Sequence, residues 1–119
     1  MLESTIVRKI KKYLEDRGAF VVKTHGNQYS TTGTPDLLCC YKGYFIALEV
    51  KTPGKIHNVT KIQAHCIQRI KECGGYASIV SSEKEVVGIL TTIDLHTCLR
   101  ESPSFIYGEY GNKTRKEEI

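Results

Sequence analysis

The sequence predicts an α/β fold in which a central mixed β-sheet is flanked by helices, with the core order α-β-β-β-α-β. Two stretches carry apolar residues at helical spacing, one near the N-terminus and one after residue 60. Short β-prone runs lie between them, and another follows the second helical stretch. Because 119 residues is the length of one ordinary domain, we expect residues 1–119 to form a single domain.

The first helix is expected over residues 2–17. Its apolar stripe consists of Leu2, Ile6, Val7, Ile10, Tyr13 and Leu14. Gly18 ends this helix. Residues 19–23 follow as a short strand, and the polar, glycine-containing stretch 25–34 is expected to be a loop.

Residues 37–41 and 44–50 are predicted to form a β-hairpin around Lys42-Gly43. A two-residue turn would set Tyr41 opposite Tyr44 and fix the register of the whole hairpin. Lysine is an uncommon residue at the first position of such a turn, so a bulge or a longer loop remains an alternative. Both faces of the hairpin are apolar, which is typical of strands in the middle of a sheet covered on both sides.

The remaining elements follow from capping and glycine signals. Thr60-x-x-Gln63 is a capping box that opens a helix over residues 60–73, which we expect to pack one apolar side on the sheet. A strand is expected over residues 76–80. A second capping box at Ser82-x-x-Glu85 predicts a short helix to about Leu90. The tail is polar, and we expect it to fray from about residue 110.

Composition limits the classes of function. The formal net charge of +4 is compatible with a polyanionic partner but does not require one. No apolar run approaches the length of a membrane span, and the N-terminus lacks the hydrophobic region of a signal peptide, so we expect a cytoplasmic protein. The five cysteines are odd in number and show no CxxC spacing, which favours buried reduced thiols over disulfides or a zinc ribbon.

The predicted hairpin brings ionisable groups together. With a two-residue turn, Asp36 lies opposite Glu49 on the same sheet face, with Cβ atoms roughly 4.5–5.5 Å apart. Strand alternation places Lys51 on that face as well. Two carboxylates facing each other in an apolar sheet destabilise it unless something neutralises them. A divalent cation would do so, and hard oxygen ligands suit Mg²⁺ or Mn²⁺.

A structural interpretation of the same residues also exists. The carboxylates could lie at the edge of the sheet, solvated or paired with Lys51 and nearby arginines. The convergence of three ionisable groups on one face of an apolar hairpin favours the functional interpretation. Glu3 continues the buried stripe of its helix, but it could equally stabilise the positive N-terminal end of that helix. Gln63 is explained by its capping box and also lies near the face that packs on the sheet.

The order Pro35-Asp36 followed by Glu49-Val50-Lys51 resembles the PD-(D/E)xK nuclease superfamily, which has a restriction-endonuclease-like core. Glu3 on the preceding helix, the loop before Pro35 and Gln63 on the following helix resemble its VRR-NUC branch, in the stand-alone form of phages and bacteria. The resemblance covers about residues 3–80. Nothing after about residue 90 matches a motif of that branch.

The resemblance implies a role for each matched residue. Asp36 and Glu49 would ligate the metal, with the carbonyl of Val50 as a further ligand. Glu3 would help to hold a metal, either this ion or a second one, directly or through water. Lys51 would orient or activate the attacking water and stabilise charge on the phosphate. Gln63 would support the site beside Lys51.

The expected activity is therefore hydrolysis of DNA phosphodiester bonds by a metal-activated water, on branched DNA such as a four-way junction. Because a chain of this size has one site, cutting two strands would require a homodimer. Candidate DNA contacts flank the site: Lys23, His25 and Asn27 on one side, and Lys55 and Lys61 on the other. The alternatives are a non-catalytic nucleic-acid-binding protein that retains the fold, and a nuclease that acts on RNA or on simple DNA ends.

Overall fold

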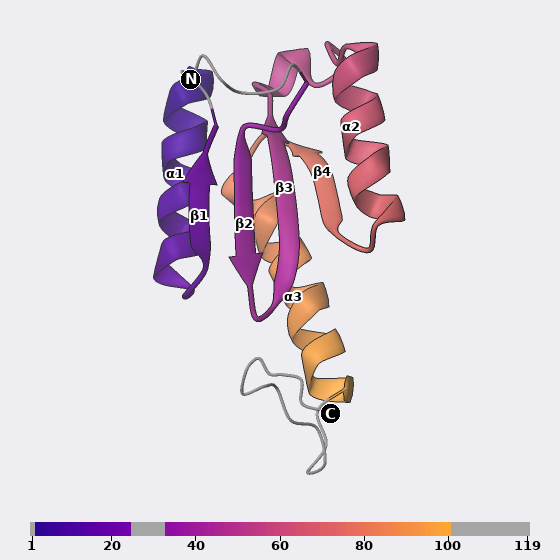
Figure 1. Ribbon diagram of the computed structural model, residues 1–119. Coiled ribbons are helices and arrows are strands. Elements are labelled where there is room, and N and C mark those ends of the chain that lie inside the picture. Colours follow the sequence, from indigo (N-terminus) through magenta and orange to yellow (C-terminus); the bar gives the residue numbers. More distant parts are fainter. Residues whose placement is uncertain (1, 25–32, 101–119) are drawn as a thin grey trace.

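The computed structural model describes residues 2–24 and 33–100, and in these the expected α/β architecture is confirmed (Figure 1). The elements in chain order are α1 (Glu3–Asp16), β1 (Phe20–Lys23), β2 (Leu37–Tyr41), β3 (Tyr44–Val50), a 3₁₀ turn η1 (Pro53–Lys55), α2 (Lys61–Glu72), β4 (Tyr76–Val80) and α3 (Glu83–Arg100). The strands form one mixed sheet in the order β1-β2-β3-β4. The first three strands are antiparallel, and β4 runs parallel to β3.

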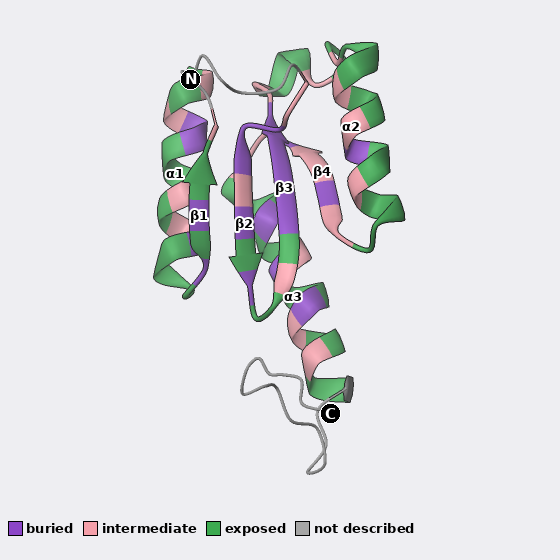
Figure 2. Cartoon of the chain, viewed as in Figure 1, coloured by how far each residue is buried: buried purple, intermediate pink, exposed green. Residues whose placement is uncertain are grey.

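The main hydrophobic core lies between one face of the sheet and helices α1 and α3, which pack on it and on each other (Figures 1 and 2). The alternation of side chains along β2 and β3 sends Leu37, Cys39, Ile46 and Leu48 into this core. Four residues of the expected α1 stripe are buried: Ile6, Val7, Ile10 and Leu14. Tyr13 is partly buried, and Leu2 precedes the helix and is exposed. The burial of this face fixes the register of the strands, since a shift by one residue would turn every core side chain to the other face.

The second face of the sheet is covered only in part. Helix α2 packs on β4, where Ile67 joins Ala47 and Ala77 in a small cluster. In the half formed by β1, β2 and the start of β3, the large apolar side chains of Phe20 and Phe45 are exposed. The expectation of a sheet covered on both sides is therefore wrong for this half, because α2 is a single short helix and lies over the β4 edge (Figure 2).

The hairpin turn has two residues, as predicted. Lys42 and Gly43 both have positive φ, at 51° and 85°, which is the pattern of a type I′ turn. The observed pairs run from Leu37 opposite Leu48 to Tyr41 opposite Tyr44. The side chain of Lys42, at the first turn position, donates a hydrogen bond to Asp94.

Helix α3 is longer than predicted, since it continues to Arg100 instead of ending near Leu90. The capping interaction predicted at the start of α3 is also shifted by one residue. Glu85 does reach back, but the backbone N–H that donates to its carboxylate belongs to Ser81, at 2.7 Å. No helix within the described ranges is both long enough and apolar enough to cross a membrane.

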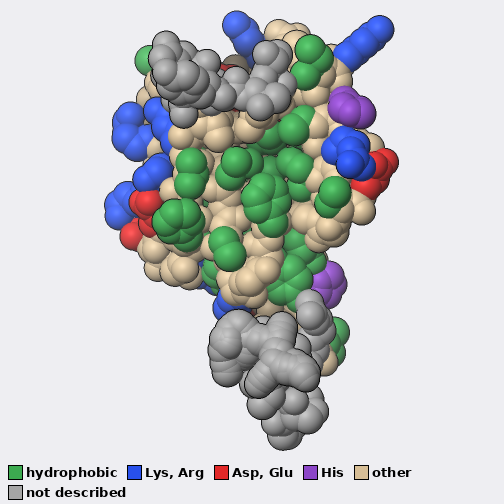
Figure 3. Space-filling view, in the orientation of Figure 1, with side chains coloured by type: hydrophobic (Ala, Val, Ile, Leu, Met, Phe, Trp, Pro, Cys, Tyr) green, Lys and Arg blue, Asp and Glu red, His purple; other side chains and the backbone are tan. Residues whose placement is uncertain are grey.

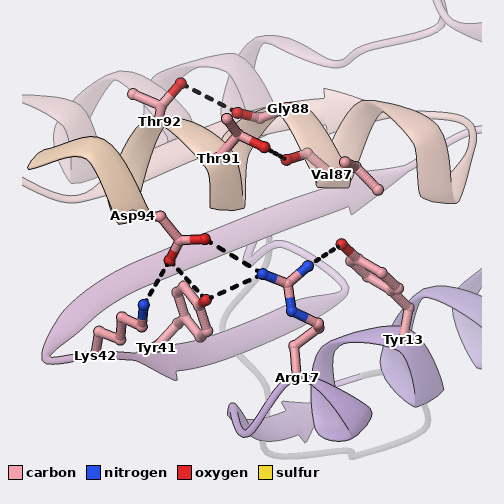
Figure 4. Close-up of polar contacts among 9 residues, drawn as sticks. All are labelled: Tyr13, Arg17, Tyr41, Lys42, Val87, Gly88, Thr91, Thr92 and Asp94. Carbon is pink, nitrogen blue, oxygen red and sulfur yellow. Dashed lines mark hydrogen bonds and ion pairs between the residues drawn. The ribbon is translucent and has the colours of Figure 1, made fainter. Parts of the chain in front are cut away.

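A polar cluster joins the lower end of the hairpin to α1 and α3 (Figure 4). The carboxylate of Asp94 accepts hydrogen bonds from the hydroxyl of Tyr41 at 2.7 Å, from Nζ of Lys42 at 2.8 Å and from Nη2 of Arg17 at 3.2 Å. Arg17 also donates to the hydroxyl of Tyr13 at 2.7 Å. The bond from Lys42, followed by that from Tyr41, holds the pKa of Asp94 below its ordinary value. We call these five residues the Asp94 cluster.

Candidate active site

The candidate site lies at the end of the sheet where β2 begins and β3 ends, which is also the end at which α1 begins (Figure 1). Asp36 directly precedes β2, and Glu49 is the penultimate residue of β3. Continued by one position beyond Leu37 and Leu48, the observed register sets Asp36 opposite Glu49. Their relative exposures are 0% and 3%, and they are the buried charged residues of the described chain.

Asp36 is fixed from two sides. The backbone N–H of Val50 donates to Oδ2 of Asp36 at 2.7 Å, so the side chain reaches across to β3. On the other side, the backbone N–H of Thr24 donates to the carbonyl of Asp36 at 2.9 Å, and its hydroxyl donates to the carbonyl of Pro35 at 2.6 Å. These bonds pin the Pro35-Asp36 segment between the ends of β1 and β3.

Glu49 is positioned by side chains from two elements. Nε2 of Gln63, in the first turn of α2, donates to Oε2 of Glu49 at 3.1 Å. Nζ of Lys51 lies 3.5 Å from the same oxygen, and both side chains of this ion pair are largely buried. The backbone N–H of Lys51 donates to the carbonyl of Val80, which anchors the end of β3 to β4. The structure thus brings four predicted site residues together: Asp36, Glu49, Lys51 and Gln63.

Gln63 takes part in two arrangements at once. Its backbone N–H donates to the hydroxyl of Thr60, and its side-chain oxygen accepts from the backbone N–H of Thr60, which completes the predicted capping box. The amide nitrogen of the same side chain is the donor to Glu49. The two interpretations of Gln63 are therefore compatible, because its amide oxygen serves the helix while its amide nitrogen serves the site.

The chain enters the site through a close contact with α2. Gly33 has a φ of 88°, and a Cβ atom at this position would clash with the side chain of Ile62. A larger residue would therefore push the Pro35-Asp36 segment away from α2. Ile62 itself is exposed. Ile67 is the residue of α2 that is buried against the sheet instead, with Ile70 packed beside it.

The donor set of the site suits a hard divalent cation. Two buried carboxylates on neighbouring strands and the carbonyl of Val50 supply oxygen ligands of the kind that Mg²⁺ and Mn²⁺ prefer. Glu3 lies in the first turn of α1, partly exposed. In the described parts of the chain no three side chains of His, Cys, Asp or Glu converge on a metal position. Glu3 is therefore not gathered with Asp36 and Glu49 into one set of ligands.

Exposed lysines flank this end of the sheet. Lys23 ends β1, Lys55 ends η1 and Lys61 begins α2, and all three side chains are exposed. The other two candidates for DNA contact, His25 and Asn27, lie outside the described residues. In Figure 3, lysine and arginine side chains stand around the upper, left and right edges of the face that carries α2, while its centre is free of them.

The sequence profile of the archaeal Holliday junction resolvase (Hjc) family matches residues 4–95, which is most of the chain and includes every residue of the site except Glu3. The chain belongs to the archaeal Holliday junction resolvase family. This membership confirms the expected nuclease superfamily. No curated protein sequence matches the chain significantly.

Two solved structures of VRR_NUC domains resemble this chain in fold. A VRR_NUC domain is 26% identical, with a TM-score of 0.55, and the match covers 75% of this chain and 94% of that domain. A second VRR_NUC domain protein is 16% identical, with a TM-score of 0.58 over 76% of this chain and 86% of that chain, and shows the same fold. The Hjc Holliday junction resolvase of the archaeal hyperthermophile Archaeoglobus fulgidus is 14% identical, covers 66% of this chain and 67% of that chain, and has a TM-score of 0.44.

Thr24 is the positioning residue that sequence reasoning missed. Its hydroxyl and its backbone N–H hold the backbone of Pro35 and Asp36. Thr24 lies 12 residues before Asp36 in the sequence, so its partner follows only from the pairing of β1 with β2. The available signal was a hydroxyl residue directly after a predicted strand, which is too common to single out this threonine.

Proposed function

We propose that this protein is a divalent-metal-dependent endonuclease that cuts branched DNA, such as a four-way junction, by a metal-activated water. The observation that carries the proposal is the burial of Asp36 and Glu49 side by side at one end of the sheet. Membership of a Holliday junction resolvase family supports the choice of substrate. Likeness to VRR_NUC domains supports an assignment to the stand-alone VRR-NUC type.

In this proposal the residues of the chain divide the work of phosphodiester hydrolysis. Asp36, Glu49 and the carbonyl of Val50 would hold the ion, and Glu3 would assist through water or at a second ion. A divalent ion bound here lowers the pKa of its water and neutralises negative charge that develops on the phosphate. The ammonium of Lys51 lies 3.5 Å from Oε2 of Glu49, where it would orient the attacking water and attract the phosphate.

Gln63 is proposed as a positioning residue. Its amide donates a hydrogen bond from α2 to Oε2 of Glu49, whereas the catalytic roles belong to the carboxylates and Lys51. Thr24 holds the backbone of Asp36 in the same manner from the side of β1. Both residues therefore hold the two carboxylates in place at this end of the sheet.

DNA is proposed to approach this end of the sheet along Lys23, Lys55 and Lys61, with His25 and Asn27 as further proposed contacts. Exposed lysines contact phosphates as point charges, so recognition would depend on backbone shape more than on base sequence. Replacing Lys55 with alanine should weaken binding equally for different sequences and reduce the salt dependence of binding. Because each chain has one site, we also propose that a homodimer makes paired cuts.

Cleavage of a labelled four-way junction tests this function. With Mg²⁺ or Mn²⁺ present, the wild-type protein should cut the junction, and Asp36→Asn and Lys51→Ala should each lose at least about 100-fold in rate. Lys84→Ala is the matched control, because Lys84 is an exposed lysine on α3, and it should retain the wild-type rate.

Three other results would each contradict the proposal. Salt-sensitive binding to the junction without metal-dependent cutting would indicate a non-catalytic DNA-binding protein. Preferential cutting of RNA or of simple DNA ends would change the substrate. Undiminished cutting by both site variants would remove the assigned residues from the mechanism.

A further inference from the structure

Ile62 is a large apolar side chain that lies exposed beside the candidate active site. It belongs to the first turn of α2, directly before Gln63, and its relative exposure is 53%. Because Gln63 donates to Glu49, Ile62 is the sequence neighbour of a direct partner of the site. Single exposed apolar residues are common on protein surfaces, so exposure alone indicates no function. The contact that holds Ile62 and the charges around it set this residue apart.

Ile62 is in close contact with the chain segment that leads into the site. Its Cγ2 fills the space that a Cβ atom of Gly33 would need, and its carbonyl oxygen would lie 3.1 Å from that atom. The φ of 88° at Gly33, together with the missing side chain, lets the segment pass this close to α2. The position of Ile62 is therefore constrained, although about half of its surface faces solvent.

The charges near Ile62 suit a nucleic acid better than an apolar protein surface. Lys61 directly precedes it and Lys55 ends η1, and both side chains are exposed. The first turn of α2 contains no acidic residue, and the positive end of the helix dipole lies there as well. Phosphates attracted to these cations would bring the adjoining bases toward the apolar side chain of Ile62.

An apolar side chain can distinguish branched DNA from a continuous duplex through its access to base faces. In a continuous duplex the base faces are stacked on one another, and inserting an apolar side chain between them costs free energy. That cost is smallest where pairing or stacking is already interrupted, as at a branch point. Contact with a base face exposed there would therefore favour the branched substrate over a linear one.

We propose that Ile62 packs against an exposed base face at the branch point and so determines the preference of this protein for branched DNA. This inference rests on the proposed function, because it concerns the substrate of the site assigned above. It adds a specificity-determining residue that has no charge and does not hold the ion. Lys55 and Lys61 would bind phosphates of any DNA arm, whereas Ile62 would recognise the interruption of stacking.

Ile62→Thr separates contact with a base from contact with Gly33. Threonine keeps a methyl group in the place of Cγ2 but carries a hydroxyl in place of the ethyl branch of isoleucine. The contact with Gly33 therefore remains, while apolar surface is lost. Because Ile62 is exposed, the variant should keep the wild-type fold, which circular dichroism checks. Leu95→Thr is the matched control, since Leu95 is an apolar residue on α3 with a relative exposure of 60%.

Binding of DNA in EDTA measures the preference without any cleavage. Dissociation constants are determined for a four-way junction and for a linear duplex with the sequence of two of its arms. The wild-type protein should bind the junction more tightly, and Ile62→Thr should reduce the ratio of the two constants about 10-fold. A fluorescent base analogue at the branch point, which brightens when unstacked, should respond to the wild-type protein and much less to Ile62→Thr. Leu95→Thr should match the wild type in both measurements.

The outcomes separate this inference from the proposed function. If the wild-type protein cuts junctions and Ile62→Thr keeps the full preference for them, the inference is wrong and the function stands. If the preference depends on Ile62 but no metal-dependent cutting occurs, the inference is supported and the catalytic part of the proposed function fails.

Three further results would overturn the inference alone. The first is a wild-type protein that binds junction and duplex equally well. The second is an equal loss of affinity for both substrates in Ile62→Thr, since a general DNA contact would give that result. The third is a loss of preference in Ile62→Ala, which also removes the contact with Gly33, without a loss in Ile62→Thr. Ile62 would then only position the segment that leads into the site.

Discussion

At the scale of single residues, Gln63 shows how one side chain serves both helix and site. Gln63→Glu separates the two roles. A glutamate at this position still accepts the N–H of Thr60 and completes the capping box, but it cannot donate to Glu49 and adds a negative charge beside it. We expect the helix cap to be retained and junction cleavage to fall about 10-fold or more, measured at saturating Mg²⁺ and well below the melting temperature.

Thr60→Ala is the complementary variant. It removes the hydroxyl that accepts from Gln63 and should cost about 1 kcal/mol in the free energy of unfolding. The amide of Gln63 can still reach Glu49, so cleavage at a temperature well below the melting temperature should fall much less than in Gln63→Glu. If both variants lose activity in proportion to their stability, Gln63 has only a structural role.

Adjacent cysteines on β2 should differ sharply in reactivity. Cys39 points into the main core, and burial raises the pKa of its thiol to about 11. Near pH 8 it should therefore hold about 200-fold less thiolate than an ordinary cysteine with a pKa near 8.5. Mass spectrometry after brief alkylation should find Cys40 modified and Cys39 intact. Equal labelling of both residues in the native protein would contradict the strand's assigned faces.

At the scale of elements, the Asp94 cluster ties the hairpin turn to α1 and α3. Because hydrogen bonds from Lys42 and Tyr41 lower the pKa of Asp94, the cluster stabilises the folded state when this carboxylate is charged. That contribution is fully present above the ordinary aspartate pKa of about 3.9 and disappears as the pH falls through the lower pKa of the folded state.

Asp94→Asn should therefore lower the melting temperature near neutral pH and differ progressively less from the wild type as the pH falls below about 4. Thermal unfolding of both proteins across this pH range measures the difference. Glu15→Gln is the control, because it removes an exposed i,i+4 pair with Lys11 and should change stability little at any pH. A difference between Asp94→Asn and wild type that stays constant with pH would show that packing, not charge, is what Asp94 contributes.

The hairpin and the site within it could be predicted because their geometry is local. A two-residue turn at Lys42-Gly43 leaves one register, and that register alone sets Asp36 opposite Glu49. The helix boundaries around Gly18 and Thr60 follow from equally local signals. The contact from Thr24 was not predictable in this way, because it depends on the pairing of β1 with β2, which are well separated in the sequence.

The length of α3 and the uncovered half of the second sheet face are consequences of tertiary packing. Gly88, Thr91 and Thr92 have low helix propensity, which favoured an early end. The helix continues because Leu90 and Ile93 are buried in the core and Asp94 is bonded to the hairpin. The hydroxyls of Thr91 and Thr92 are satisfied by carbonyls of their own helix (Figure 4). The apolar residues on both faces of the strands, in turn, do not show how much of the second face the single helix α2 can cover.

At the scale of the whole molecule, the site should reduce stability until it binds its ion. Asp36 and Glu49 are two like charges buried next to each other in the sheet, which opposes folding. A ligand that binds only the folded state stabilises it, by about 2.7 kcal/mol when present at 100 times its Kd. In a protein of this size, such a change raises the melting temperature by roughly 10 °C or more.

Asp36→Asn should relieve the destabilisation of the ion-free protein and reduce its stabilisation by the ion. The asparagine oxygen can still accept the N–H of Val50, while one of the two buried charges is removed. In EDTA we therefore expect a melting temperature equal to or above that of the wild type, together with a much smaller rise on adding Mn²⁺. Lys84→Ala, remote from the site, should show the full wild-type rise. A full Mn²⁺ response in Asp36→Asn, or a severe loss of stability in EDTA, would mean that this carboxylate is part of the folded framework and not a ligand.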